Sequence, residues 1–232
     1  MDFLTSAALA SEAAAICGAA GWQVERVSDL ATVPDLVADL GKNYLTPLSD
    51  PRRSDLWSDN AAALLARDAS TGAPVAFGLA RREVMGAAGP SAYWPRLLAR
   101  AYVDGARSVV DRVSPEAAAV FDGARTVAYF GDVFVADRAR GKASALRAFS
   151  AIAHLTIGAE WSPDLVYCFM DGRKVRRGLA LSVGFLSVLP SPMVWAADPP
   201  SPRSSAEWLA YTRAADRAAM VRALLVADGV GV

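Results

Sequence analysis

Cysteine and histidine are scarce in this chain of 232 residues, which contains only Cys17, Cys168 and His154 of these two types. Two cysteines provide no disulfide framework, and together with one histidine they lack the spacing of a zinc site. We therefore expect no bound metal and a reducing, cytoplasmic environment. The apolar run around Cys168 predicts a small buried hydrophobe. His154 stands among apolar helical residues, which predicts a packed or surface side chain rather than a catalytic one.

An excess of charge of one sign and long apolar runs are also missing. The 24 basic and 24 acidic side chains cancel, so we expect no nucleic-acid partner. No apolar run approaches the roughly 20 residues that cross a bilayer, and Asp2 replaces the basic start of a signal peptide. We expect neither secretion nor membrane insertion. With 53% hydrophobic residues and no internal repeat, the composition favours one large globular domain.

Residues 126–158 combine a strand, a turn and a helix. Apolar β-branched and aromatic residues predict a strand over 126–135, and apolar residues at helical spacing predict a helix after the turn. The turn itself has the sequence Arg140-Gly141-Lys142-Ala143-Ser144-Ala145. Small residues there let backbone N–H groups at a helix N-terminus approach an anion, and the helix dipole favours phosphate. The stretch therefore predicts a phosphate-binding turn.

This turn resembles motif A of the GNAT superfamily of N-acetyltransferases, written (Gln/Arg)-x-x-Gly-x-(Gly/Ala), which binds the pyrophosphate of acetyl-CoA. Arg140 matches the first position and Ala145 the last, whereas Ala143 stands where the family usually has glycine. Alanine fits there if the backbone is helical, because only a positive φ favours glycine. The alternative is an ordinary strand-to-helix connection with solvated Arg140 and Lys142.

The rest of the chain predicts further elements on both sides of this stretch. Before it we expect a helix at 1–20, a strand at 22–27, a helix opening near Pro34, and a hairpin of 62–68 with 75–84. Helical sequence fills 85–123, with Ser114 and Pro115 starting a second short helix. After it we expect a strand at 164–170, a helix at 173–183, a hairpin of 185–189 with 193–197, and a helix at 206–226.

This order of elements resembles the acetyltransferase fold across residues 22–197, and Gly184-Phe185 matches a pair that begins a strand in that family. The resemblance implies an α/β fold class with a mixed sheet of α+β type, the acyl-CoA N-acyltransferase (GNAT-like) fold, and a helical insert between strands 3 and 4. We divide the chain into a helical extension at 1–21, one domain at 22–204 with its insert at 86–123, and a C-terminal helix at 205–232. That helix packs on the domain or on a partner, so a homodimer is one interpretation.

The resemblance also implies acetyl-CoA as co-substrate, without a metal. Backbone groups of Phe134 and Val135, beside Val133, would bind the pantetheine arm and polarise the thioester. The turn at 140–145 would hold the pyrophosphate, contributing the residues Arg140, Gly141, Lys142, Ala143, Ser144 and Ala145.

The sequence indicates the general acid and the general base of such a transfer less directly than it indicates the cofactor site. Many family members have a tyrosine four residues before the Gly-Phe pair, and this chain has Ala180 there. Ser182 and Tyr167 are the nearby candidates for the acid, with a water or another tyrosine as alternatives; Tyr167 also fits a half-buried strand aromatic. Asp132 is our first candidate for the base, ahead of Glu83, because a carboxylate is unusual in an otherwise apolar strand.

We therefore expect an acyl-CoA-dependent N-acyltransferase that moves acetyl from acetyl-CoA to a primary amine of a small molecule or a protein. The alternatives are a transferase of longer acyl chains with the same fold, and a non-catalytic CoA-binding or interaction module. Arg52, Arg53 and Trp57 precede the first hairpin, and the resemblance places their loop near the amine acceptor, where they favour an acidic or aromatic acceptor. A solvated loop with one buried tryptophan explains them equally well.

Overall fold

A computed structural model of the chain describes residues 1–103 and 108–226. Its first half contains α1 (Phe3–Ala19), β1 (Trp22–Arg26), α2 (Val33–Asp39), β2 (Ala61–Asp68), β3 (Pro74–Val84), α3 (Gly89–Val103), β4 (Val110–Val113) and α4 (Pro115–Val120). The second half contains β5 (Thr126–Val135), α5 (Ala143–Trp161), β6 (Leu165–Asp171), α6 (Gly172–Arg176), α7 (Leu179–Ser182), β7 (Ser187–Pro190), β8 (Met193–Trp195), β9 (Glu207–Arg213) and α8 (Arg217–Leu225). No helix of the described residues is long and apolar enough to cross a membrane.

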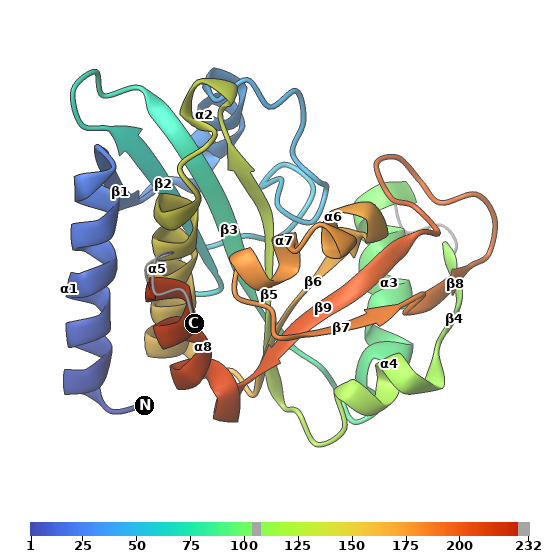
Figure 1. The fold of residues 1–232 in the computed structure, drawn as a ribbon. Helices are drawn as coiled ribbons and strands as arrows, with labels where there is room; N and C mark the ends of the chain where they lie inside the picture. Colours follow the sequence, from blue (N-terminus) through green and yellow to red (C-terminus); the bar gives the residue numbers. More distant parts are fainter. Residues whose placement is uncertain (104–107, 227–232) are drawn as a thin grey trace.

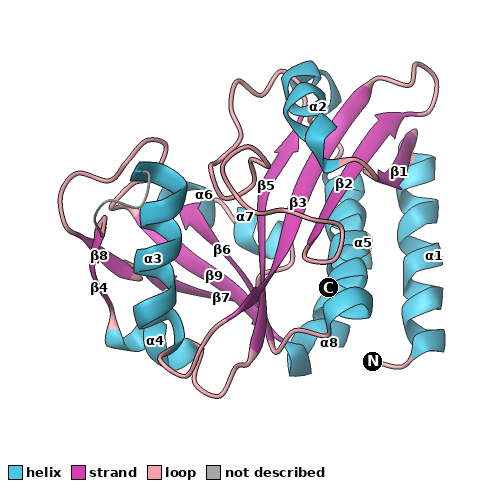
Figure 2. Cartoon of the chain, turned by 180° about the vertical axis from the view of Figure 1, so that it is seen from behind, coloured by secondary structure: helices cyan, strands magenta, loops and turns pink. Residues whose placement is uncertain are grey.

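Seven strands form one mixed sheet in the order β1-β2-β3-β5-β6-β9-β7. All neighbouring strands are antiparallel except β5 and β6, which are parallel. Figure 1 shows α1, α5 and α8 gathered on one side of the molecule, with α3 and α4 beside the far end of the sheet, and Figure 2 shows the same arrangement from behind. The sheet and its parallel pair confirm the predicted fold class, a mixed α/β architecture.

Side-chain alternation along β2 explains how the sheet is covered on both faces. Leu64 belongs to the large core that includes α1 and α5, whereas Leu65 belongs to a second core cluster with Val33 and Val37 of α2. Successive side chains of a strand point to opposite faces, so a nearly continuous apolar run indicates burial on both sides.

The predicted hairpin of β2 and β3 is confirmed, as is the strand-turn-helix unit of β5 and α5. The predicted start of α4 is confirmed as well, because the Ser114 hydroxyl accepts a hydrogen bond from the Ala117 N–H at 3.1 Å. The insert lies between the third and fourth strands of the large sheet, β3 and β5.

The insert is not wholly helical, which corrects one prediction. Residues Val110–Val113, assigned to a helical stripe by their apolar spacing, form β4 and pair with β8. The part of the predicted stripe at 104–107 lies outside the described residues. β-branched valines at both ends of this short segment favour a strand once a partner strand is available.

The C-terminal helix predicted for 206–226 is wrong over its first half. Glu207–Arg213 forms β9, which lies between β6 and β7 and pairs with both, and the helix α8 begins only at Arg217. The segment EWLAYTR is rich in strand-forming residues. The edge of β6 supplies its pairing partner, which a sequence pattern does not reveal. The division into three segments, including residues 205–232, stays a prediction.

Two neighbouring predictions also need correction. The expected closing hairpin does not form, because β7 pairs with β9 and β8 pairs with β4. The expected helix at 173–183 is split into α6 and α7 by Gly178, whose φ of 81° lies in the left-handed region that glycine adopts readily.

Candidate functional site

β5 and β6 pair only over their first residues and then part. Parallel pairing joins Val127 to Leu165, Ala128 to Val166 and Tyr129 to Tyr167. Beyond this point β5 continues along β3 with a bulge, where Phe134 pairs with Phe77 and Gly131 with Leu79. Asp132 lies in the bulge with φ of 53°, an uncommon value for a residue with a side chain. The bulge turns β5 away from β6 and opens the sheet.

A cavity of about 600 Å³ occupies this opening, and we call it the splay cavity. Its walls come from β5 at 129–134, from β6 and α6 at 168–174, and from the loop after α2 at 41–46. Leu179, Val183 and Phe185 line it near α7, and Arg203 and Glu207 line it near β9.

A second cavity of about 300 Å³ lies at the N-terminus of α5, and we call it the α5 cavity. It is lined by Ala143, Leu146, Lys174, Arg177, Leu179 and Ser182. Lys174 and Leu179 line the splay cavity too, so the two cavities adjoin. A long ligand with its anionic end at α5 has a path from there into the opening of the sheet.

The turn at 140–145 has the conformation of a free helix N-terminus. Gly141 has φ of 89°, so this position needs glycine, whereas Ala143 is already the first residue of α5 and tolerates a methyl group. Among the described residues, no side chain caps the first turn of α5. Its N–H groups are therefore available to an anion.

The charged side chains of this turn point elsewhere. Arg140 pairs with Asp137 at 2.7 Å on the surface, and the Lys142 ammonium donates to the Ala20 carbonyl at 2.7 Å. Phe134 lines the splay cavity, and Val135 does not. Neither residue pairs with β6, whose register with β5 ends at Tyr167.

Asp132 lies in the wall of the splay cavity, as expected for a candidate base, but its carboxylate is occupied. The side chain is 1% exposed and forms an ion pair with Lys42. It also accepts hydrogen bonds from the Thr46 hydroxyl and, at 3.3 Å, from the Thr46 N–H.

Tyr167 is fully buried beside the splay cavity and is absent from its wall. Its hydroxyl donates to Glu83 Oε2 at 2.6 Å and accepts from Trp94 Nε1 at 3.0 Å. Arg81 pairs with the same Glu83 carboxylate. Burial raises the pKa of Tyr167 well above its usual value, and the negative charge of Glu83 acts in the same direction. Both Tyr167 and Glu83 therefore belong to a hydrogen-bonded core network.

Ser182 lines the α5 cavity, where its hydroxyl donates to the Gly178 carbonyl at 3.1 Å. It does not line the splay cavity. The structure thus distributes the three predicted catalytic side chains over three different places, Asp132 in the opening of the sheet, Tyr167 in the core and Ser182 beside α5.

Tyr129 is a cavity residue that the sequence pattern did not single out. It lines the splay cavity, and a Cβ placed on Gly131 would lie 2.7 Å from its hydroxyl oxygen. The absence of a side chain at Gly131 therefore lets the phenol lie against the bulge. Burial raises the pKa of Tyr129 well above its usual value, which keeps the phenol protonated. Its hydroxyl makes no hydrogen bond to another residue of the described chain.

Arg203 and Glu207 are also cavity residues that the sequence pattern did not single out. The Arg203 side chain is 3% exposed and forms an ion pair with Glu207 at 2.8 Å. Burial raises the pKa of Glu207, and the positive charge of Arg203 opposes this. Both residues escaped sequence analysis because their segment was assigned to a connector and a helix, although the strand composition of EWLAYTR was visible.

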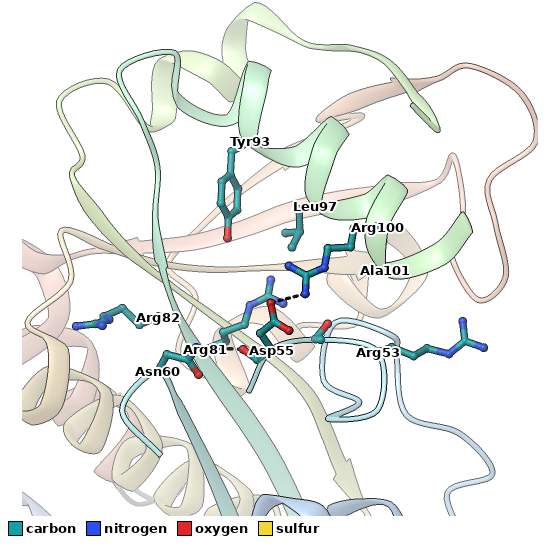
Figure 3. Close-up of a pocket in the computed structure, with 10 residues that line it drawn as sticks. Arg53, Asp55, Asn60, Arg81, Arg82, Tyr93, Leu97, Arg100 and Ala101 are labelled. Carbon is teal, nitrogen blue, oxygen red and sulfur yellow. Dashed lines mark hydrogen bonds and ion pairs between the residues drawn. The ribbon is translucent and has the colours of Figure 1, made fainter. Parts of the chain in front are cut away.

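A separate, shallow pocket of about 150 Å³ lies between α3 and the loop before β2 (Figure 3). Arg53, Arg81, Arg82 and Arg100 line it, and Arg100 pairs with Asp55. Figure 3 shows the Tyr93 ring pointing from α3 toward Arg81 of β3.

Of the three loop residues expected near an acceptor, only one lines this pocket. Arg53 lines it, whereas Arg52 pairs with Asp50 and Trp57 is 59% exposed. None of the three lines the splay cavity, and the expected buried tryptophan is on the surface.

The lone histidine is packed in the core. His154 is fully buried, and its Nε2 lies 3.1 Å from the Val183 carbonyl. Burial lowers its pKa to about 4, so it is neutral at pH 7. Cys168 is buried too, as predicted, and burial raises the pKa of its thiol. Within residues 1–103 and 108–226, no three His, Cys, Asp or Glu side chains are grouped to hold a metal.

No family model and no curated protein sequence matches the chain. Solved structures do match. FeeM, an N-acyl amino acid synthase from uncultured soil microbes, aligns with a TM-score of 0.50 at 10% identity over 84% of this chain and 92% of its own. The alignment with FeeM agrees with the strand order described above. The chain has the GNAT fold.

Two other solved structures align over similar lengths. A polyamine N-acetyltransferase from Drosophila melanogaster has a TM-score of 0.49 at 13% identity, over 83% of this chain and 99% of its own. Spermidine N-acetyltransferase SpeG from Vibrio cholerae has a TM-score of 0.45 at 10% identity, over 87% of this chain and 96% of its own. The strand order and the alignment with FeeM confirm the sequence resemblance at the level of fold.

Proposed function

We propose that the protein is an acyl-CoA-dependent N-acyltransferase that transfers acetyl from acetyl-CoA to a primary amine. The observation that carries the proposal is the continuity of the two cavities through Lys174 and Leu179. Acetyl-CoA has an anionic pyrophosphate at one end of a flexible arm and a thioester at the other, and the adjoining cavities match this division.

The pyrophosphate would bind at the N-terminus of α5. The uncapped first turn supplies backbone N–H groups and the positive end of the helix dipole. Lys174 and Arg177 line the α5 cavity, and no acidic residue does. In this arrangement Gly141, Ala143, Ser144 and Ala145 act through their backbone, and Arg140 and Lys142 add positive charge nearby.

The pantetheine arm would pass along β5 into the splay cavity. The edges of Phe134 and Val135 toward β6 have no strand partner, so their backbone groups suit the amides of the arm. The thioester would then lie in the splay cavity near the bulge, beside the Tyr129 hydroxyl.

The transfer requires one bond to form and one to break. A neutral amine nitrogen attacks the thioester carbonyl carbon, the new C–N bond replaces the C–S bond, the nitrogen loses a proton, and the CoA thiolate gains one. We assign the proton on the nitrogen to Asp132, whose carboxylate lies in the cavity wall, with Lys42 and Thr46 holding it in place. We assign the proton for the thiolate to Tyr129, which stands in the cavity where Tyr167 and Ser182 do not.

Binding of acetyl-CoA is the first test. A ligand at 100 times its dissociation constant stabilises the folded state by about 2.7 kcal/mol. Thermal unfolding should therefore shift upward with acetyl-CoA and remain unchanged with adenosine, which lacks the pyrophosphate and the arm. An unchanged transition with both compounds would contradict the proposal.

Turnover is the second test. Thiol release from acetyl-CoA should require an amine from a panel of polyamines, amino acids and lysine peptides, because the matching structures include enzymes of the first two kinds. Persistent binding without thiol release over the whole panel would indicate a non-catalytic CoA-binding module instead.

The size of the splay cavity favours a second candidate, a transferase of longer acyl chains. The cavity holds about 600 Å³, and Phe130, Val183 and Phe185 make part of its wall apolar. Comparing kcat/KM for octanoyl-CoA and acetyl-CoA with one amine separates the two candidates, since a site built for the longer chain prefers octanoyl-CoA.

A further inference from the structure

The turn at 140–145, where the pyrophosphate is proposed to bind, is exposed and has little support of its own. Gly141, Ala143 and Ser144 are exposed, and no side chain of the described residues caps the first turn of α5. Gly141 has φ of 89°, and a glycine permits many other backbone conformations. A turn that orients its N–H groups toward a pyrophosphate therefore needs a support from outside the turn.

Lys142 connects this turn to another element through its side chain. It is the N-cap residue of α5, and its ammonium donates a hydrogen bond to the carbonyl of Ala20, the C-cap residue of α1, at 2.7 Å. Figure 1 shows α1 and α5 side by side and running in opposite directions, so the C-terminal end of α1 meets the N-terminal end of α5. The bond thus joins two helix ends that are 122 residues apart in the sequence.

The charge of Lys142 suits the end of α1. The last carbonyl groups of a helix carry partial negative charge and have no partner within the helix. A cationic side chain that hydrogen-bonds to them is favourable, and α1 has no basic residue in its own last turn. Lys142 of α5 therefore supplies the cation that the end of α1 lacks.

The end of α1 is itself firmly placed, so it can serve as an anchor. Cys17 is 1% exposed and belongs to the core that includes α5. The Ala20 N–H donates to the Cys17 carbonyl at 3.1 Å, and the carbonyl of the next residue, Gly21, accepts from the Ala69 N–H at 2.8 Å. Ala69 directly follows β2. The Lys142 contact therefore links the turn to the sheet through the end of α1.

We propose that Lys142 is a positioning residue of the cofactor site, which ties the pyrophosphate-binding turn to the C-terminal end of α1. This inference rests on the proposed function, and it adds α1 to the elements that support the site. Lys142 acts through the turn rather than through a bond to phosphate. Loss of the tie lowers the fraction of molecules whose turn is arranged for binding, and the apparent affinity for acetyl-CoA falls by the same factor.

The first measurement uses the free protein, to which no phosphate compound is added. Lys142→Met removes the donor and the charge and keeps most of the apolar stem. Hydrogen exchange should become about 5-fold faster at the amides of Ala20, Gly21 and Leu146, which are hydrogen-bonded at the two tied helix ends. Lys142→Arg, which restores a donor and the charge, should return exchange to the natural rate. Thermal unfolding verifies that each variant is folded.

The second measurement follows acetyl-CoA by isothermal titration calorimetry and by steady-state thiol release. In Lys142→Met the dissociation constant and KM for acetyl-CoA should rise about 5-fold, while kcat stays nearly constant because the thioester lies at the other end of the cofactor. Lys142→Arg should recover the natural affinity. A general loss of structure would lower kcat together with the affinity.

Arg140→Gln is the matched control for charge. It removes a positive charge from the same turn, and the Arg140 side chain pairs with Asp137 and not with α1. Both variants lose the attraction of a cation for phosphate, which salt screens. At high salt Lys142→Met should still bind acetyl-CoA several-fold more weakly than the natural protein, and Arg140→Gln should leave exchange at Ala20 and Gly21 unchanged.

The outcomes separate this inference from the proposed function. Unchanged exchange in Lys142→Met overturns the inference and leaves acetyl-CoA binding standing. Equal losses of affinity in Lys142→Met and Arg140→Gln that both vanish at high salt overturn it as well, because Lys142 then acts through its charge alone. If the natural protein does not bind acetyl-CoA, the proposed function fails and the cofactor role of Lys142 fails with it, whatever the exchange rates.

Discussion

Tyr129 shows how a single residue acquires a role that its sequence neighbourhood does not signal. Along the strand it is one aromatic among several, and it becomes distinctive because Gly131 leaves room for its hydroxyl at the bulge. A proton donor must reach the leaving sulfur and must be protonated at working pH. The raised pKa of Tyr129 meets the second condition, and we propose that its place in the splay cavity meets the first.

Tyr129→Phe removes this hydroxyl and nothing else. We expect kcat to fall by on the order of 100-fold, because general acid catalysis contributes about that much, while KM for acetyl-CoA stays nearly constant. Steady-state thiol release measures both constants. Tyr211→Phe, a change on β9 outside the splay cavity, is the matched control. An unchanged kcat in Tyr129→Phe would assign the proton to water instead.

His154 makes a pH prediction whose sign follows from its burial. Its pKa is lowered from about 6.5 to about 4 in the folded protein, so the unfolded chain binds the proton more readily. The stabilisation is complete above pH 6.5 and is lost as the pH falls toward 4, by about 3 kcal/mol.

Urea unfolding at several pH values between 7 and 4.5 measures this loss. In His154→Gln the free energy of unfolding should fall less steeply over the same range, because the titrating group is gone. Other acidic groups contribute equally to both proteins, so the difference between the two slopes isolates His154. Parallel slopes would show that His154 titrates normally and is not buried as described.

At the scale of an element, the N-terminus of α5 is a helix end without a cap. Ser144 lies in its first turn and is exposed. A carboxylate there interacts favourably with the helix dipole but repels a bound phosphate. Stability and ligand affinity should therefore change in opposite directions.

For Ser144→Asp we expect stability to rise by about 0.3–1 kcal/mol and the affinity for acetyl-CoA to fall on the order of 10-fold. Thermal unfolding and isothermal titration calorimetry measure the two quantities. Ser144→Ala, which adds no charge, should alter the affinity little. Undiminished affinity in Ser144→Asp would place the pyrophosphate elsewhere.

β9 is the element whose observed structure differs most from the structure predicted by its sequence pattern. It is bonded on both sides, to β6 and to β7, so its amides depend on the opening of the whole sheet. Hydrogen exchange at Glu207–Arg213 should be as slow as at Leu165–Asp171. Exchange within minutes across this segment, with β6 still protected, would contradict its place in the sheet.

At the scale of the whole molecule, segments far apart in sequence share one sheet. β9 comes from the end of the chain and lies beside β6, while β1 and β2 form the opposite edge. The molecule should therefore unfold as one unit. We expect a single calorimetric transition with equal calorimetric and van't Hoff enthalpies, and loss of folding when residues 205–232 are deleted. Two separable transitions would contradict the single domain predicted for 22–204.

The turn at 140–145 and the strand-helix order around it were predictable from the sequence. Gly141 and the residues that follow it determine a turn and a helix start through their own backbone preferences, and apolar spacing reveals β5 and α5. The position of Asp132 in a strand was also visible, but its pairing with Lys42 was not, because Lys42 is distant in sequence and the bulge alters the direction of the side chain.

The sequence alone thus determined the fold class and the proposed cofactor end of the site, since both depend on local periodicity and on short-range turn geometry. The tertiary structure decided which strands pair, and with that it decided which residues near the C-terminus line the splay cavity. A strand forms at 207–213 because β6 leaves an unpaired edge there, and this pairing brings Glu207 and the neighbouring Arg203 to the opening between β5 and β6. Hydrogen bonding between strands depends on partners remote in the chain, which no local pattern records.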